Sequence, residues 1–119
     1  MTDNNKKKVL IIDDETDLCL LLKDYFVRKS YEVSISHTLK GGMHELNVQT
    51  PDILFLDNNL PDGIGWNLAA QIAEDHSSVL IVLISAFHPQ VPVMPPAARY
   101  RTIEKPISFA DLNKLFAQL

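Results

Sequence analysis

The sequence has one cysteine, no long hydrophobic run and fewer basic than acidic residues, and each shortage excludes a class of protein. Cys19 has no partner within the chain, which excludes an internal disulfide and fits a reducing compartment. The longest apolar run, residues 79–84, is too short to cross a bilayer. The 11 basic residues stand against 15 acidic ones, so the chain lacks the basic surface that nucleic-acid binding requires. We therefore expect a cytoplasmic protein that contacts neither membrane nor nucleic acid.

The composition that remains is typical of one folded domain. Hydrophobic residues make up 46% and charged residues 22% of the 119 residues, which is enough apolar material for a single core. The chain has no internal repeat, linker or low-complexity segment. We predict one domain over residues 1–119, with a polar N-terminal tail over residues 1–8.

Short apolar runs alternate with stretches of helical periodicity along the whole chain. Continuous runs rich in β-branched residues are typical of strands that are buried on both faces. Strands are predicted at residues 9–12, 32–36, 53–56, 79–84 and 100–104, and helices after a cap at Asp14 or Thr16, at 38–48, at 66–74 and after a cap at Ser108. Repeated strand–helix units require right-handed crossovers. The fold class is therefore α/β, with a doubly wound, five-stranded parallel sheet.

One segment departs from this alternation. A helix is due at residues 88–98, yet Pro89, Pro92, Pro95 and Pro96 fall within it. Each proline inside a helix removes an amide donor and clashes with the preceding turn, at a cost of about 3 kcal/mol or more. We predict an extended loop there, with at most one turn near Ala97.

Polar residues follow the predicted strands at the point where each one ends. Asp13 and Asp14 follow the first strand, Asp57 ends the third, Ser85 follows the fourth and Lys105 follows the fifth. In doubly wound sheets, function gathers at the carboxyl ends of the strands. Carboxylates at close range repel one another, and Mg²⁺ relieves that repulsion while binding phosphate oxygens. A carboxylate in such a site is suited to form an aspartyl phosphate.

These pieces together resemble the receiver domain of two-component response regulators, the CheY-like family. The resemblance covers nearly the whole chain and rests on five motifs in register, at residues 9–15, 51–57, 60–65, 85–86 and 105–106. It implies a flavodoxin-like receiver fold in which Asp57 accepts the phosphoryl group. It also implies a Mg²⁺ site formed by Asp14 directly, Asp13 mainly through water, Asp57 itself and the backbone carbonyl of Asn59.

The resemblance assigns the remaining polar residues to the phosphoryl group. Ser85, the Ala86 amide and Lys105 would hold its oxygens, and the Lys105–Pro106 bond is expected to be cis. The implied partner is a histidine kinase or phosphotransfer protein, with an unknown downstream effector. Such a domain is a signalling phosphoacceptor, not an enzyme, apart from its own phosphorylation and dephosphorylation.

Two departures from the family pattern concern signal output. The fourth helix is degraded or replaced by the proline-rich loop, and Thr102 stands where the family usually has an aromatic residue, with Tyr100 two residues earlier. We therefore expect an atypical output surface. One alternative is a degenerate receiver that acts as a scaffold through the 88–98 loop. A less favoured alternative is an aspartyl-phosphate hydrolase, because such enzymes typically have a second Asp where this chain has Asn59.

Overall fold

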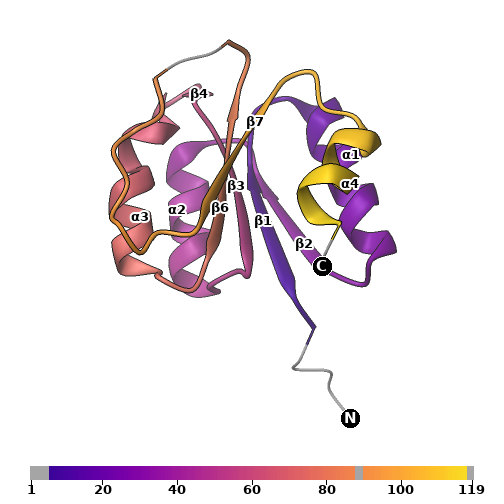
Figure 1. The fold of residues 1–119 in the computed structure, drawn as a ribbon, viewed down its shortest axis with the longest axis horizontal. Helices are drawn as coiled ribbons and strands as arrows, with labels where there is room; N and C mark the ends of the chain where they lie inside the picture. Colours follow the sequence, from indigo (N-terminus) through magenta and orange to yellow (C-terminus); the bar gives the residue numbers. More distant parts are fainter. Residues whose placement is uncertain (1–5, 88–89, 118–119) are drawn as a thin grey trace.

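A parallel sheet of five strands, with helices on both faces, forms the centre of the molecule (Figure 1). The structure is a computed structural model that describes residues 6–87 and 90–117. The sheet strands, in the spatial order β2-β1-β3-β6-β7, are β1 (Lys8–Ile12), β2 (Glu32–Ser36), β3 (Ile53–Asp57), β6 (Leu80–Ser85) and β7 (Tyr100–Glu104). The helices are α1 (Thr16–Arg28), α2 (Leu39–Val48), α3 (Ala69–Asp75) and α4 (Phe109–Phe116). The predicted doubly wound α/β sandwich is confirmed.

The bounds of β1, β3 and β6 differ from the expectation by one residue at one or both ends. Lys8, which was expected in the tail over residues 1–8, pairs with Glu32 and belongs to β1. The strand β6 begins at Leu80 and includes Ser85, which pairs with Glu104. Backbone pairing with the neighbouring strand decides these ends, whereas hydrophobic periodicity marks only the buried residues.

The two faces of the sheet carry separate hydrophobic cores. On one face, α1 and α4 pack against alternate strand residues, with Phe26, Phe55 and Phe116 in edge-to-face or tilted contact. On the other face, α2 and α3 cover Leu54, Leu56 and their neighbours. All five residues of β3 are buried. The continuous apolar runs of the sequence therefore correspond to strands covered on both sides.

The starts of the first and last helices depend on different contacts. At α4, Ser108 and Asp111 form a reciprocal capping box, as the sequence predicts for Ser108. At α1, the N-cap position is Glu15, and no side chain caps it. The prediction of Asp14 or Thr16 as the cap was wrong. The turn is instead held by Asp13, whose Oδ1 accepts a hydrogen bond from the Glu15 amide at 2.8 Å.

A short hairpin follows β3 and leads into the third helix. Its strands are β4 (Asn59–Leu60) and β5 (Gly63–Ile64), and a 3₁₀ helix, η1 (Gly65–Leu68), then precedes α3. The predicted helix over 66–74 therefore begins with a tighter turn. The Trp66 indole donates a hydrogen bond to the Leu56 carbonyl at 3.2 Å, which holds this turn against the sheet. A side chain at Gly65 would collide with the backbone carbonyl of Asp57.

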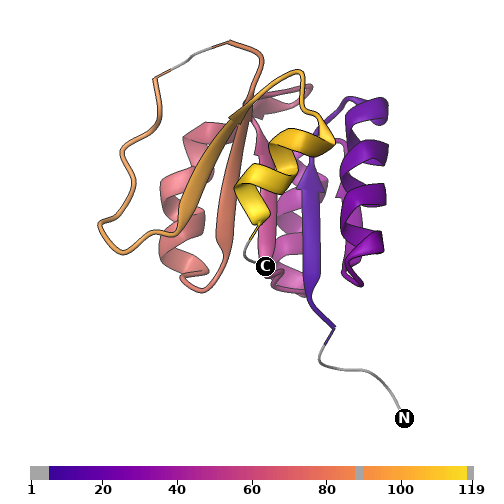
Figure 2. The ribbon, with the colours of Figure 1, turned by 45° about the vertical axis from the view of Figure 1, so that its right-hand side comes forward.

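The proline-rich segment has no helix in its described part, residues 86–87 and 90–99 (Figure 2). Its one turn closes where the Ala98 amide donates to the Pro95 carbonyl at 2.9 Å, close to the predicted position. Met94 and Ala98 pack against the core on the α3 side. The prediction that the fourth receiver helix is replaced is confirmed there, and His88 and Pro89 lie outside the described residues.

In the described residues, no helix combines the length and the apolar character needed to cross a membrane.

Candidate functional site

The carboxyl ends of two neighbouring strands bring three carboxylates together. Asp13 follows β1, Asp57 ends β3, and these strands pair directly through Ile12 and Leu56. Carboxylate oxygens of Asp13, Asp14 and Asp57 all lie within 4.8 Å of one another. Asp13 and Asp57 are 0% and 3% exposed, whereas Asp14 is open to solvent. The predicted acid cluster therefore exists, with two buried members and one accessible member.

Lys105 reaches the same cluster from the end of β7. Its ammonium lies 3.0 Å from Glu15 Oε1, 3.3 Å from Asp13 Oδ2 and 3.6 Å from Asp57 Oδ1. The Lys105 amide donates to the Ser85 carbonyl at 2.8 Å, and the bond to Pro106 is cis, as expected. The lysine is thus fixed at its backbone while its side chain spans three acids.

Burial, together with the charges of neighbouring residues, shifts the pKa values of the cluster. Burial, with the neighbouring charge of Asp13, raises the pKa of Asp57 to about 6 despite the attraction of Lys105. Burial also raises the pKa of Asp13, against the Glu15 amide hydrogen bond and the Lys105 charge. Burial by itself lowers the pKa of Lys105, but the contacts with Glu15, Asp13 and Asp57 outweigh it and raise that pKa. One ammonium therefore does not compensate the buried carboxylates.

The remaining predicted residues surround this centre. Ser85 is buried at the end of β6, and its neighbour Ile84 pairs with Asp57 across the sheet. Ala86 follows directly and is exposed. Asn59 lies two residues beyond Asp57, in β4, where it pairs with Ile64. The fold thus brings every predicted site residue to one edge of the sheet.

Two residues at this edge were not assigned a role from the sequence. Glu15 makes the shortest contact with Lys105, and the only sequence signal for it is its place in the acidic run Asp13–Glu15. His37, at the end of β2, has its Nδ1 2.9 Å from the Asp13 carbonyl oxygen. No spacing pattern links His37 to Asp13, because the contact depends on the pairing of β2 with β1.

The residues present fit a hard divalent cation. All three carboxylates offer oxygen ligands, which Mg²⁺ prefers. Asp13 Oδ2 is buried and lacks a hydrogen-bond partner among the described residues, so it has a lone pair available beside the Lys105 contact. A cation would also relieve the repulsion from Asp13, which adds to burial in raising the pKa of Asp57.

Comparison with known proteins places this geometry in a family. A family model described as the response regulator receiver domain matches residues 9–117. The chain belongs to this receiver family. This match confirms the resemblance to the receiver family that was drawn from the motifs.

Individual relatives agree with the assignment. The receiver is 26% identical to the response regulator protein PilR of Pseudomonas aeruginosa over 115 residues, which are 95% of this chain but 26% of PilR. The chain therefore spans about a quarter of the length of that relative. Its fold is similar to a CheY-like receiver from Methanospirillum hungatei, with a TM-score of 0.83, 21% identity and coverage of 96% and 93% of the two chains.

A second solved structure was determined with a bound ligand. The response regulator TrrA of Thermotoga maritima, in complex with Mg²⁺–BeF, has a TM-score of 0.79 and 23% identity, with 94% and 97% of the chains covered. TrrA is also known in a complex with the histidine kinase ThkA. At this identity the likeness demonstrates the shared receiver fold.

Proposed function

We propose that this receiver accepts a phosphoryl group on Asp57 from a histidine kinase or a phosphotransfer protein. The observation that carries the proposal is the position of Asp57, a buried carboxylate at the sheet edge between two further acids and the ammonium of Lys105. Positioning and charge neutralisation perform most of phosphoryl transfer, and this set supplies both. The kinase complex of TrrA supports the partner class.

The chemical step uses the ionised form of Asp57. A carboxylate oxygen attacks the phosphorus of a phosphohistidine, the P–O bond forms, and the P–N bond breaks with its electron pair returning to the imidazole. Lys105 exchanges part of its contact with Asp13 and Glu15 for a contact with a phosphoryl oxygen. The Ser85 hydroxyl and the Ala86 amide donate to the other oxygens. The product is a mixed anhydride that water later hydrolyses.

We further propose a Mg²⁺ site formed by Asp13, Asp14, Asp57 and the backbone carbonyl of Asn59. When bound, Mg²⁺ neutralises negative charge on the phosphoryl oxygens. The buried Oδ2 of Asp13, which accepts no hydrogen bond among the described residues and has only the ion pair with Lys105, and the oxygen-only donor set support this assignment. The Mg²⁺–BeF complex of TrrA supports it from a relative of the same fold.

Signal output from this receiver is proposed to be atypical. Thr102 and Tyr100 alternate along β7, pairing with Leu83 and Ile81, and both are exposed. Thr102 has no ring that can move toward Asp57, and the described part of the proline-rich segment has no helix to receive such a movement. We also propose one domain over residues 1–119 and a cytoplasmic location, the latter because the single cysteine forms no disulfide within the chain.

A second candidate function is a scaffold that binds a protein through the proline-rich segment. It is favoured by the exposure of apolar side chains there, since Val93 is 91% exposed and Phe87 is 79% exposed. Exposed large apolar groups of this kind mark interaction surfaces. This role does not require Asp57 to be phosphorylated, which makes the two candidates separable.

The deciding experiment is mass spectrometry of the intact protein after incubation with Mg²⁺ and acetyl phosphate. We expect one phosphoryl increment in the wild type and in Asp75→Asn, an exposed aspartate at the end of α3. Asp57→Asn should show none. A folded wild type without the increment would reject the phosphoacceptor in favour of the scaffold. Continuous release of phosphate over many turnovers would instead indicate a hydrolase.

A further inference from the structure

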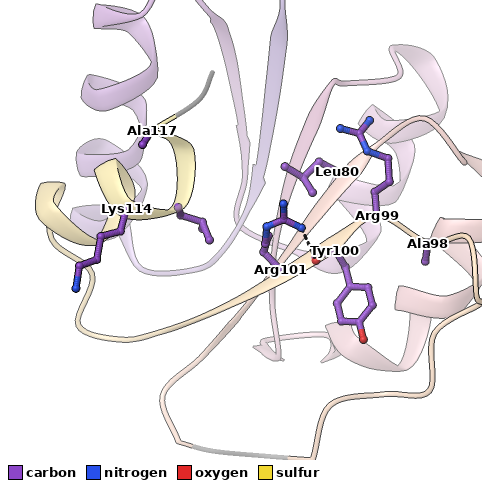
Figure 3. A pocket seen from close by; sticks show the side chains of 8 residues that line it. Leu80, Ala98, Arg99, Tyr100, Arg101, Lys114 and Ala117 are labelled. Carbon is purple, nitrogen blue, oxygen red and sulfur yellow. Dashed lines mark hydrogen bonds between the residues drawn. The ribbon is translucent and has the colours of Figure 1, made fainter.

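A cavity lies at the end of β7 opposite to the acid cluster (Figure 3). It has a volume of about 690 Å³, is open to solvent on one side, and is bordered by the start of β7, the start of β6 and the last turn of α4. Its lining includes Arg99, Arg101 and Lys114, together with the apolar side chains Leu80 and Leu115. The acids of the phosphorylation site gather beyond the other end of β7, around Lys105, so the two sites are separate.

Positive charge dominates this cavity. Figure 3 shows Arg99 and Arg101 extending to the same side of β7, while the Tyr100 ring extends to the other side. Lys114 borders the cavity from α4, and in Figure 3 its ammonium extends away from the two arginines. The residues that line the cavity include no carboxylate in the part of the chain that the structure describes. The chain as a whole has a net charge of −4, so the three cations that border this cavity make it locally positive on an acidic protein.

The two arginines are held in place by backbone carbonyls and not by acids. The Arg99 guanidinium donates to the Ser78 carbonyl at 3.1 Å, and the Arg101 guanidinium donates to the Tyr100 carbonyl at 3.2 Å. Neither arginine takes part in an ion pair within the described residues. A guanidinium has five N–H donors, so each group retains donors and its full charge for a ligand.

The arginines at the cavity are not explained by ion pairs with nearby acidic residues. Arg99 also borders a small second cavity with Asp52, but the Asp52 carboxylate accepts the Lys8 amide at 2.8 Å. Lys114 has an acid on its own helix, since its charge helps to lower the pKa of Asp111 after the hydrogen bonds from Ser108. Arg101 has no such neighbour among the lining residues and is therefore the most diagnostic of the three.

We propose that this cavity binds a small organic phosphate of nucleotide size, as a ligand site separate from phosphorylation of Asp57. The guanidinium groups match phosphate oxygens in pairs, which supplies the anionic half of the recognition. Leu80 and Leu115 provide an apolar surface for the organic part of the ligand. A volume of 690 Å³ falls in the range of about 300–1,000 Å³ that is usual for small-molecule sites.

The test is isothermal titration of the protein with ADP in the presence of EDTA, so that no cation links the ligand to the acid cluster. We expect saturable binding that is tighter than that of inorganic phosphate. Removal of a charged hydrogen-bond donor in Arg101→Gln or Arg99→Gln should weaken ADP binding by about tenfold or more. The matched control Arg28→Gln, an exposed residue of α1, should stay within about twofold of the wild type.

Several results would overturn the proposal. They are the absence of saturable ADP binding, an equal loss in Arg28→Gln, and inorganic phosphate binding as tightly as ADP. Displacement of ADP by a short DNA duplex at lower concentration would instead identify a nucleic-acid surface. Circular dichroism melting of each variant controls for folding, and Lys114→Gln provides an independent variant on α4. Asp57→Asn should bind ADP normally, which separates this site from the phosphoacceptor.

Discussion

Replacement of Asp57, the proposed phosphoacceptor, by Asn should make the metal-free protein more stable at neutral pH. The Asp57 carboxyl is 3% exposed, and burial with the adjacent Asp13 charge raises its pKa to about 6 from the model-compound value of 3.8. The folded protein therefore binds this proton more tightly than the unfolded chain does. The stability that protonation of Asp57 contributes to the folded protein is complete below pH 3.8 and is lost as the pH rises through about 6.

The magnitude follows from the two pKa values. At pH 7.5 the ionised Asp57 costs about 3 kcal/mol of unfolding free energy, and at pH 4.5 only about 1 kcal/mol. Asp57→Asn removes this cost, so its melting temperature at pH 7.5 should rise by about 10 °C for a chain of this size. The gain in melting temperature of Asp57→Asn over the wild type should become smaller toward pH 4.5. Millimolar Mg²⁺ should also reduce it, because the cation stabilises only the intact cluster.

Equilibrium unfolding in urea, followed by the fluorescence of the buried Trp66, measures this difference. Urea is uncharged and leaves the electrostatics of the cluster unscreened. The matched control is Asp62→Asn. Hydrogen bonds from the Lys40 and Leu39 amides lower the pKa of Asp62, so its replacement should destabilise the protein. An Asp57→Asn protein no more stable than wild type in EDTA at pH 7.5, or a gain that does not change with pH, would refute the reasoning.

Three further predictions concern the metal, the site loop and the last helix. If the Mg²⁺ dissociation constant is about 1 mM, 10 mM Mg²⁺ should stabilise the wild type by about 1.4 kcal/mol, and calorimetry should show most of this lost in Asp13→Asn. Gly65→Ala should cost about 1–3 kcal/mol in urea unfolding, because its methyl group meets the Asp57 carbonyl, whereas Gly63→Ala meets only the end of a leucine side chain and should cost less. Ser108→Ala should cost about 1 kcal/mol, measured in the same way, because it removes the capping box of α4; an unchanged midpoint would contradict that role.

Local patterns in the sequence determined most of the elements and the candidate site. Continuous apolar runs predicted β1, β3 and β6, since a strand covered on both faces needs no polar alternation. The prolines ruled out a helix in the segment before β7 because proline lacks an amide donor, and this effect needs no tertiary contact. The acids at strand ends indicated the site because parallel strands all end at one edge.

Only the tertiary structure decided which of these groups touch and what that does to their charges. The pairing of β1 with β3 places Asp13 beside Asp57, and the raised pKa of Asp57 depends on that pairing and on burial. The contact between Glu15 and Lys105 joins residues 90 positions apart, a separation at which sequence periodicity carries no information. The cationic cavity likewise arises where the start of β7 meets the end of α4.

The sequence by itself thus determined the strands, the proline-rich loop and the chemistry available at the sheet edge, because these depend on local patterns. Distances, burial and cavities depend on how distant segments pack, and the tertiary structure alone decided them.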